Sequence, residues 1–211
     1  MNSHLFKLLE RYPELNSCRD EINKVFVTIL QSLRGGGKLL LCGNGGSAAD
    51  VEHWSGELLK GFAKKRTLSR KEKNSLPEYL NGKIQGAIPA IPLTGFPSLS
   101  TAFANDVDPN LTFAQLVWGL GKPGDVLIGM STSGNATNVC AAMEVAKAKG
   151  MIRVVLTGQT GGKLLSLSDI CLQVPSMETY RVQELHLPVY HCLSLMLEDE
   201  FFPENSTESG K

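Results

Sequence analysis

The sequence has no excess of either charge and no long apolar run. Its 211 residues carry 21 Lys and Arg against 21 Asp and Glu, so the formal net charge is zero. A dedicated nucleic-acid-binding protein normally carries a basic excess, so we expect no direct contact with nucleic acid. No apolar run approaches the roughly 18 residues that span a bilayer. The first residues are charged and amphipathic and lack the apolar region of a signal peptide. We therefore expect a cytoplasmic protein that does not bind membranes.

Cysteine pairs of the CxxC type are also absent. The five cysteines lie at positions 18, 42, 140, 171 and 192. Cys42 and Cys171 fall in apolar strand-like runs and Cys192 in an apolar helix-like run. This placement is typical of buried, reduced thiols, so we expect none of them to be a nucleophile or a metal ligand.

The chain does contain enough apolar sequence, 42%, for one sizeable core. Helix is predicted for residues 3–34, with a break near Pro13. Short apolar runs then alternate with Gly- or Ser-rich loops and helices. The predicted strands span 38–42, 125–130, 152–157 and 169–174, with a weaker edge strand at 87–93, and the predicted helices span 48–62, 136–149, 163–166 and 179–201. This alternation predicts an α/β fold, a three-layer sandwich whose central parallel sheet is flanked by helices, as in flavodoxin-like and Rossmann-like proteins.

Three segments are distinguished along the chain. Residues 1–34 are predicted to be a helical segment that packs on the domain and on partners, because their apolar stripe is longer than one domain need cover. Residues 35–205 form the α/β domain, and 206–211 a flexible tail. An insertion at about 63–85 is basic, and we expect it to be an exposed, mobile loop.

Two loops have the chemistry of an anion site. Gly43–Ser47 and Ser131–Asn135 each follow a predicted strand and precede a helix. Ligands of open parallel sheets bind beyond the carboxyl ends of the strands, where hydroxyls join the free N–H groups of helix N-termini. Asn135 is also a candidate cap of the helix that follows. Together the loops predict a phosphate or sugar-phosphate site.

A dinucleotide site is the alternative for the first loop, because Gly43, Gly45 and Ala48 satisfy a loose G-x-G-x-x-A pattern. That fingerprint needs an acidic residue about 20 positions later. This chain has Ala63 and Lys64 there. The alternative also leaves the second loop unexplained, so a nicotinamide enzyme is disfavoured.

Candidate catalytic and metal-binding residues lie on two predicted helices. His53 and Glu57 stand four apart and share one helix face, either as a solvated pair or near the ligand. Gln183 and His191 lie on the last helix, which also carries Glu184 and His186. Eight residues of helix rise about 12 Å, so one straight helix cannot direct Gln183 and His191 at one ion. Either Pro188 bends the helix or a neighbouring subunit supplies one of the two.

Four runs carry a resemblance to a known family: CGNGGSAADVEHWSGEL, FANDVDPN, GDVLIGMSTSGNATNV and RVQELHLPVYH. Over about residues 38–201 the chain resembles the phosphoheptose isomerases, SIS-domain enzymes that interconvert sedoheptulose 7-phosphate and D-glycero-D-manno-heptose 7-phosphate. The resemblance implies an SIS-domain fold, a homotetramer with sites between subunits, one zinc ion per site and a role in lipopolysaccharide precursor biosynthesis.

The resemblance also implies roles for individual residues. Glu57 and His191 match the proposed acid–base pair of an enediol mechanism, in which a proton moves between C1 and C2. The family positions that hold zinc match His53, Glu57, Gln183 and His191. The zinc ion would polarise the carbonyl. The substrate-contacting positions match Asn44, Gly45, Gly46, Ser47, Glu57, Asn105, Asp106, Ser131, Thr132, Ser133 and Gln183.

The chain departs from the family pattern at Ala136, where many relatives have Ser, and at Tyr180, where some have Asp. Two other functions stay open. One is a non-catalytic SIS-domain factor that binds the replication initiator and has a similar ending to LEDEFFP, but lacks the groups that match Glu57 and His191. The other is a different phosphosugar isomerase or a phosphosugar sensor.

Overall fold

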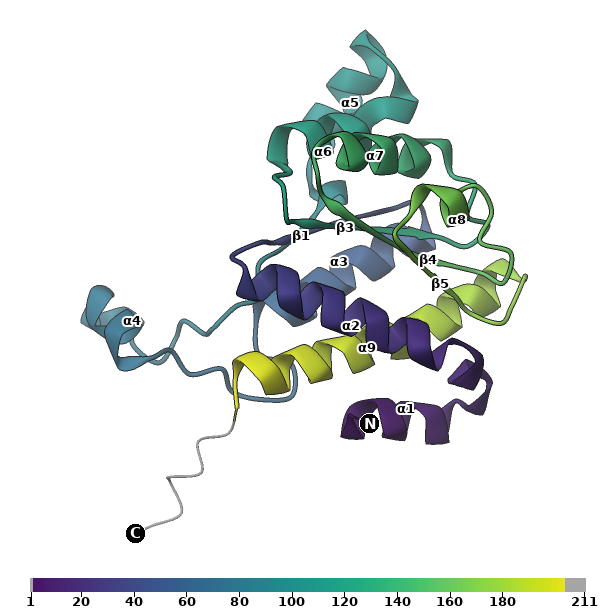
Figure 1. Cartoon of the computed structure of the whole chain (residues 1–211). Helices are drawn as coiled ribbons and strands as arrows, with labels where there is room; N and C mark the ends of the chain where they lie inside the picture. The colour runs from purple at the N-terminus through teal and green to yellow at the C-terminus, as the bar shows by residue number, and fades with distance from the viewer. Residues whose placement is uncertain (1, 204–211) are drawn as a thin grey trace.

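A sheet of five parallel strands forms the centre of the protein, whose computed structural model describes residues 2–203 (Figure 1). The strand order is β2-β1-β3-β4-β5. The strands span Leu39–Gly43 (β1), Ala90–Pro92 (β2), Val126–Ser131 (β3), Ile152–Thr157 (β4) and Ile170–Gln173 (β5). Strand β2 lies at the edge, where prolines remove the fewest ladder hydrogen bonds. The predicted parallel sheet and its proline-containing edge strand are confirmed.

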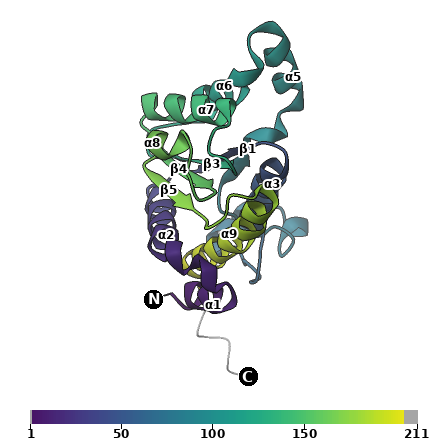
Figure 2. The same cartoon turned by 90° about the vertical axis from the view of Figure 1, so that its right-hand side faces the viewer.

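Helices cover both faces of the sheet (Figures 1 and 2). The lower layer in Figure 1 consists of α1 (Ser3–Arg11), α2 (Arg19–Arg34), α3 (Gly46–Leu59) and α9 (Thr179–Phe201). The upper layer consists of α5 (Pro97–Asp106), α6 (Thr112–Leu120), α7 (Thr137–Ala148) and α8 (Leu164–Leu167). Helix α4 (Arg70–Ser75) stands away from the body, and 3₁₀ helices span Pro13–Cys18, Glu78–Leu80, Leu93–Gly95 and Pro109–Leu111. The three-layer α/β architecture is therefore confirmed.

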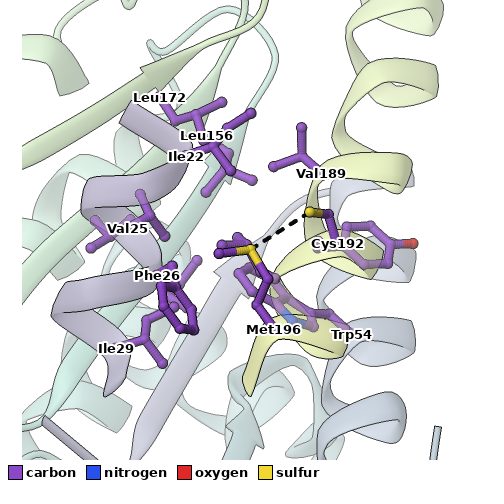
Figure 3. Close-up of a cluster of buried hydrophobic side chains, with 14 of the residues drawn as sticks. Ile22, Val25, Phe26, Ile29, Trp54, Leu156, Leu172, Val189, Cys192 and Met196 are labelled. Carbon is purple, nitrogen blue, oxygen red and sulfur yellow. Dashed lines mark hydrogen bonds between the residues drawn. The ribbon is translucent and has the colours of Figure 1, made fainter. Parts of the chain in front are cut away.

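The larger hydrophobic core within residues 2–203 lies between the sheet and the lower helices (Figure 3). Ile22, Val25 and Ile29 of α2 are fully buried there, opposite Met196 of α9. The chain itself thus covers these stripe residues, so the stripe alone does not require a partner copy. Packing of the segment on partners stays a prediction. As expected, the helical segment breaks at Pro13, since α1 ends at Arg11.

All five cysteines are free thiols. Burial raises the pKa of the Cys42 thiol to about 12, which agrees with a structural role. Within residues 2–203, no helix is both long and apolar enough to cross a membrane. The predicted tail at 206–211 lies outside the described residues.

Candidate active site

The loops after β1 and β3 line one cavity of about 360 Å³. Eight of the predicted substrate residues meet there. The lining consists of Asn44, Gly45, Gly46, Ser47, Met130, Ser131, Thr132, Ser133, Ala136, Thr179 and Gln183. None of these side chains carries a charge, so an ion in the cavity would be recognised by hydroxyl, amide and backbone groups.

Three helices begin at this cavity. Helix α3 starts at Gly46, α9 starts at Thr179, and Ala136 is the N-cap residue of α7. The first N–H groups of a helix have no intrahelical partner and carry the positive end of its dipole. Three such ends at one cavity favour an anion, as the two loops predicted.

Local hydrogen bonds shape the two loops. The side-chain amides of Asn44 and Asn138 donate to each other at 2.8 and 2.9 Å and link the loops. Gly134 has φ +68°, and a Cβ there would collide with the Gly161 carbonyl, so only glycine fits. The expected cap role of Asn135 is wrong. Its side chain donates to the Ser133 carbonyl and accepts from the Lys163 N–H instead.

Gln183 belongs to this cavity through close packing. A Cβ on Gly46 would collide with the Gln183 amide, so glycine at 46 lets the amide approach the loop. Tyr180, one turn earlier, is 62% exposed and donates to Glu178. Ala136 lines the cavity with a methyl group and provides no hydroxyl.

His53, Glu57 and His191 form a second group, on α3 and α9. His53 Nε2 lies 3.1 Å from Glu57 Oε1, and the rings of His53 and His191 are 5.1 Å apart at 80°. The side chains of His53 and Glu57 are 46% and 15% exposed, so the group is open to solvent at His53. One chain thus brings the two predicted acid–base residues together: Glu57 and His191 each contact the imidazole of His53.

Two buried atoms of this group have no hydrogen-bond partner among the described residues. They are Glu57 Oε2 and His191 Nε2, although Lys60 Nζ forms an ion pair with Glu57 Oε2 at 3.7 Å. Burial lowers the pKa of His191, and the charge of His53 lowers it further, against the opposing effect of Glu57. The neutral imidazole is therefore the main form of His191 near neutral pH.

Tyr190 and Asp50 form a hydrogen-bond chain that ends on His53. The Tyr190 hydroxyl lies 3.0 Å from His53 Nδ1 and 3.3 Å from Asp50 Oδ1. Its ring stacks on Trp54, with centroids 5.7 Å apart and planes at 19°. Burial raises the pKa of Tyr190, and the negative charge of Asp50 raises it further, so the hydroxyl keeps its hydrogen.

The donor types suit a zinc ion, but one chain does not assemble a complete set. Among residues 2–203, no three His, Cys, Asp or Glu side chains converge as a metal site. Two ligands of a tetrahedral zinc ion lie about 3.3–3.6 Å apart, close to the 3.1 Å between His53 and Glu57. The unpartnered Glu57 and His191 atoms also fit coordination. Gln183 does not join them, because α9 continues through Pro188 and places Gln183 at the cavity between the two loops.

Asn105 and Asp106 lie in neither group. They end α5, are exposed, and hydrogen-bond to each other at 2.9 Å. No residue of α5 is buried by the described chain. The structure of one chain therefore does not bring these two predicted substrate residues to the cavity.

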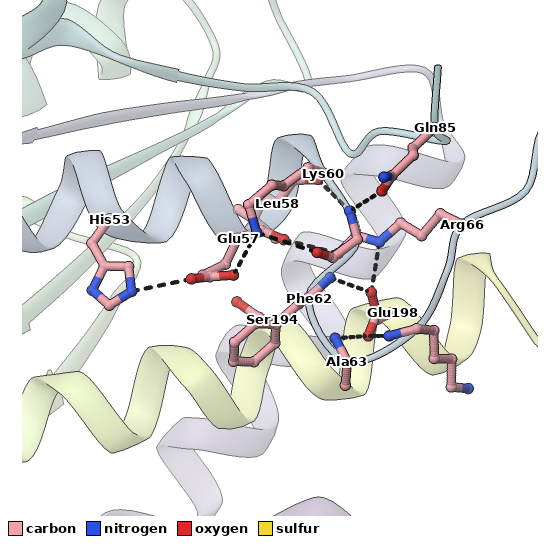
Figure 4. Close-up of polar contacts among 12 residues, drawn as sticks. His53, Glu57, Leu58, Lys60, Phe62, Ala63, Arg66, Gln85, Ser194 and Glu198 are labelled. Atoms are coloured by element: carbon pink, nitrogen blue, oxygen red, sulfur yellow. Dashed lines mark hydrogen bonds and ion pairs between the residues drawn. The ribbon is translucent and has the colours of Figure 1, made fainter. Parts of the chain in front are cut away.

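The basic insertion is anchored at the C-terminal end of α3, so the expectation of an exposed loop is wrong for Arg66 (Figure 4). The Arg66 guanidinium is fully buried and donates to Glu198 Oε1 at 2.7 Å. It also donates to the carbonyls of Leu58 and Glu57 at the end of α3. Residues 69–85 of the insertion are mostly exposed, as expected.

Glu198 completes this anchor from α9. Its carboxylate also accepts the N–H groups of Phe62, Ala63 and Lys64. Burial alone raises the pKa of Glu198, but these hydrogen bonds and the Arg66 charge outweigh burial and lower it. The ion pair thus joins the end of the helix that carries Glu57 to the helix that carries His191.

Comparison with known proteins agrees with this geometry. Two sequence models of the SIS domain match residues 6–74 and 99–196. The phosphoheptose isomerase of Roseiflexus sp. (strain RS-1) is 43% identical over 176 residues, 83% of this chain and 80% of that protein. The solved phosphoheptose isomerase of Neisseria gonorrhoeae has a TM-score of 0.74 at 31% identity, covering 93% of this chain and 96% of its own. That of Francisella tularensis has a TM-score of 0.77 at 31% identity, covering 90% and 91%.

The parallel sheet, the cavity at its loops and the two domain matches define an SIS-domain protein. By the identity and coverage of these relatives, the chain belongs to the phosphoheptose isomerase family, and it is a phosphosugar isomerase.

Proposed function

We propose that this isomerase converts sedoheptulose 7-phosphate into D-glycero-D-manno-heptose 7-phosphate. The observation that carries the proposal is that α3 and α9 build both parts such a reaction needs, an anion cavity and a carboxylate–imidazole pair. The heptose itself is inferred from the relatives, which are named phosphoheptose isomerases.

Each part has a role in the proposed reaction. The cavity binds the phosphate through Ser131, Ser133 and the N–H groups of the helix ends. The Glu57 carboxylate transfers the proton between C1 and C2, and His191 exchanges a proton with the sugar oxygens. His191 suits this exchange because its neutral ring has one nitrogen that donates and one that accepts.

We also propose that one zinc ion per site is held by His53, Glu57, His191 and Gln183. When bound, the ion would polarise the carbonyl and stabilise the enediolate. Since Gln183 lies about 12 Å of helix rise from His191, the fourth ligand is proposed to come from a neighbouring copy. A shared site needs at least two copies, and we propose the homotetramer that the family resemblance implies, in which Asn105 and Asp106 of the unburied α5 also reach a neighbour's site.

Incubation of the purified protein with sedoheptulose 7-phosphate, with and without added zinc, tests the proposal. We expect conversion to the aldose, faster with zinc. Binding without conversion would indicate a sensor, and conversion of only another sugar phosphate would indicate a different isomerase.

Replacing Ser131 or Ser133 by Ala is expected to weaken binding of the phosphorylated sugar. Each hydroxyl would supply a charge-assisted hydrogen bond of about 1.5–3 kcal/mol, which corresponds to roughly 10- to 150-fold in affinity. Titration calorimetry with the phosphorylated sugar and its phosphate-free counterpart measures the effect. Equal losses for both sugars would show that this loop does not hold the phosphate.

Mixing two inactive variants is expected to restore activity if the site is shared between copies. A Glu57→Gln chain keeps an intact Gln183, and a Gln183→Ala chain keeps an intact Glu57. A mixed pair therefore contains one complete site, and random mixing leaves about a quarter of sites complete. Refolding the two chains together and assaying the mixture measures this.

The matched control is a mixture of Glu57→Gln with His191→Ala. These two residues lie together within one chain, so no combination of copies rebuilds a complete site, and the control mixture should stay inactive. Restoration in neither mixture, or a fully active monomer by light scattering, would contradict the shared site.

A further inference from the structure

A short relay of hydrogen bonds ends on His53. It runs from Asp50 Oδ1 to the Tyr190 hydroxyl, at 3.3 Å, and from that hydroxyl to His53 Nδ1, at 3.0 Å. Tyr190 is fully buried, and its ring is held by stacking on Trp54. The hydroxyl position is therefore set by packing.

The direction of the relay follows from how many hydrogens are present. A carboxylate can only accept, and the tyrosine hydroxyl has one hydrogen to donate. If the hydroxyl donated to His53, Asp50 Oδ1 would lose its donor, and Asp50 Oδ2 already has none among the described residues. A partly buried carboxylate that loses its one donor is destabilised. The hydroxyl therefore donates to Asp50, and its oxygen accepts a hydrogen from His53 Nδ1.

The consequence appears at the other ring nitrogen. With the hydrogen fixed on Nδ1, Nε2 faces Glu57 Oε1 at 3.1 Å, and both atoms present lone pairs. A divalent metal ion bound by both atoms would fit between these lone pairs.

We propose that Tyr190 and Asp50 are positioning residues that fix the hydrogen of His53 on Nδ1 and so leave Nε2 available to bind a divalent metal ion. The metal part of this inference rests on the proposed function; the placement of the hydrogen does not. Metal-binding histidines commonly donate their second nitrogen in this way, and loss of the partner typically lowers metal affinity 10- to 100-fold.

Nitrogen NMR of the metal-free protein tests the hydrogen placement directly. With ¹⁵N-labelled histidine, and the His53 signals assigned from a His53→Gln variant, wild-type Nδ1 should carry a hydrogen. In Tyr190→Phe, which keeps the ring on Trp54, the Nδ1 donor loses its partner and the hydrogen should move to Nε2, which can donate to Glu57. Tyr180→Phe, on the exposed part of α9, should leave the signals unchanged. A wild-type Nδ1 without hydrogen, or identical signals in Tyr190→Phe, would overturn the proposal.

Zinc affinity, measured by competition with a chelating dye, tests the metal-binding part of the proposal. We expect the Kd of Tyr190→Phe to rise 10- to 100-fold above that of wild type and of Tyr180→Phe. Equal affinities in all three would overturn the role of the relay in metal binding. If wild type binds no zinc, the proposed zinc site is wrong, and the NMR comparison alone decides the relay.

Discussion

Glu57→Gln and His191→Ala are each expected to lower isomerase turnover 10²–10⁴-fold, the range that a positioned acid–base group contributes. Gln cannot take up the proton from carbon, and Ala removes the imidazole. We expect both variants to fold, because Gln has the shape of Glu57 and His191 Nε2 hydrogen-bonds to no described residue. Steady-state kinetics of each variant, with thermal unfolding as the check on folding, measures the effect.

Glu184→Gln is the matched control for the first of these variants. Glu184 lies on α9 near the site, but its side chain is exposed and pairs with Arg181. It should keep wild-type turnover. Near-wild-type turnover in both Glu57→Gln and His191→Ala would show that the acid–base pair lies elsewhere.

Arg66→Met is expected to lower the free energy of unfolding by about 3–5 kcal/mol, because it leaves a buried carboxylate without its cation. Glu198 and Arg66 are both fully buried, so solvent cannot replace the lost partner. The change also frees the carbonyls of Glu57 and Leu58, so turnover should fall as well. Urea unfolding followed by circular dichroism measures the loss.

Arg181→Met tests the same change in an exposed setting. Arg181 pairs with Glu14 at 2.8 Å, and its side chain is 44% exposed. Solvent and salt screen an exposed ion pair, so this variant should unfold almost as wild type does. Equal small losses in the two variants would contradict the anchoring role of Arg66.

Sequence patterns located the sheet well because its strands are short apolar runs bounded by Gly- or Ser-rich loops. The predicted strand at 152–157 and the final helix at 179–201 have the bounds found in the structure. The two loops that line the cavity were located for the same reason, since each is a few consecutive Gly-, Ser- or Asn-rich residues; their binding of phosphate stays a prediction. The family assignment, reached from motifs in the sequence, is confirmed by the relatives.

Helices α5 and α6 were not predicted. Helix α5 buries no residue in the described chain, so its sequence has no apolar stripe directed at this core. Helix α6, TFAQLVWGL, is apolar on most of its surface and shows little amphipathic alternation. Periodicity detects neither kind of helix.

The supporting residues of the site were also missed, because each depends on a distant partner. Arg66 meets Glu198 132 positions away, and Tyr190 meets His53 137 positions away. A basic residue in a charged stretch indicates a surface until its buried partner is known. One local signal was available: Asp50 lies one helical turn before His53, and Tyr190 directly precedes His191.

Isomerisation of sedoheptulose 7-phosphate in D₂O, followed by proton NMR, tests the central claim most directly. In the proposed mechanism Glu57 carries the transferred proton, which exchanges with solvent before it returns to carbon. The account predicts an aldose product with deuterium at C2, formed by the wild-type enzyme and lost with Glu57→Gln. No conversion, or conversion with no deuterium in the product, would contradict it.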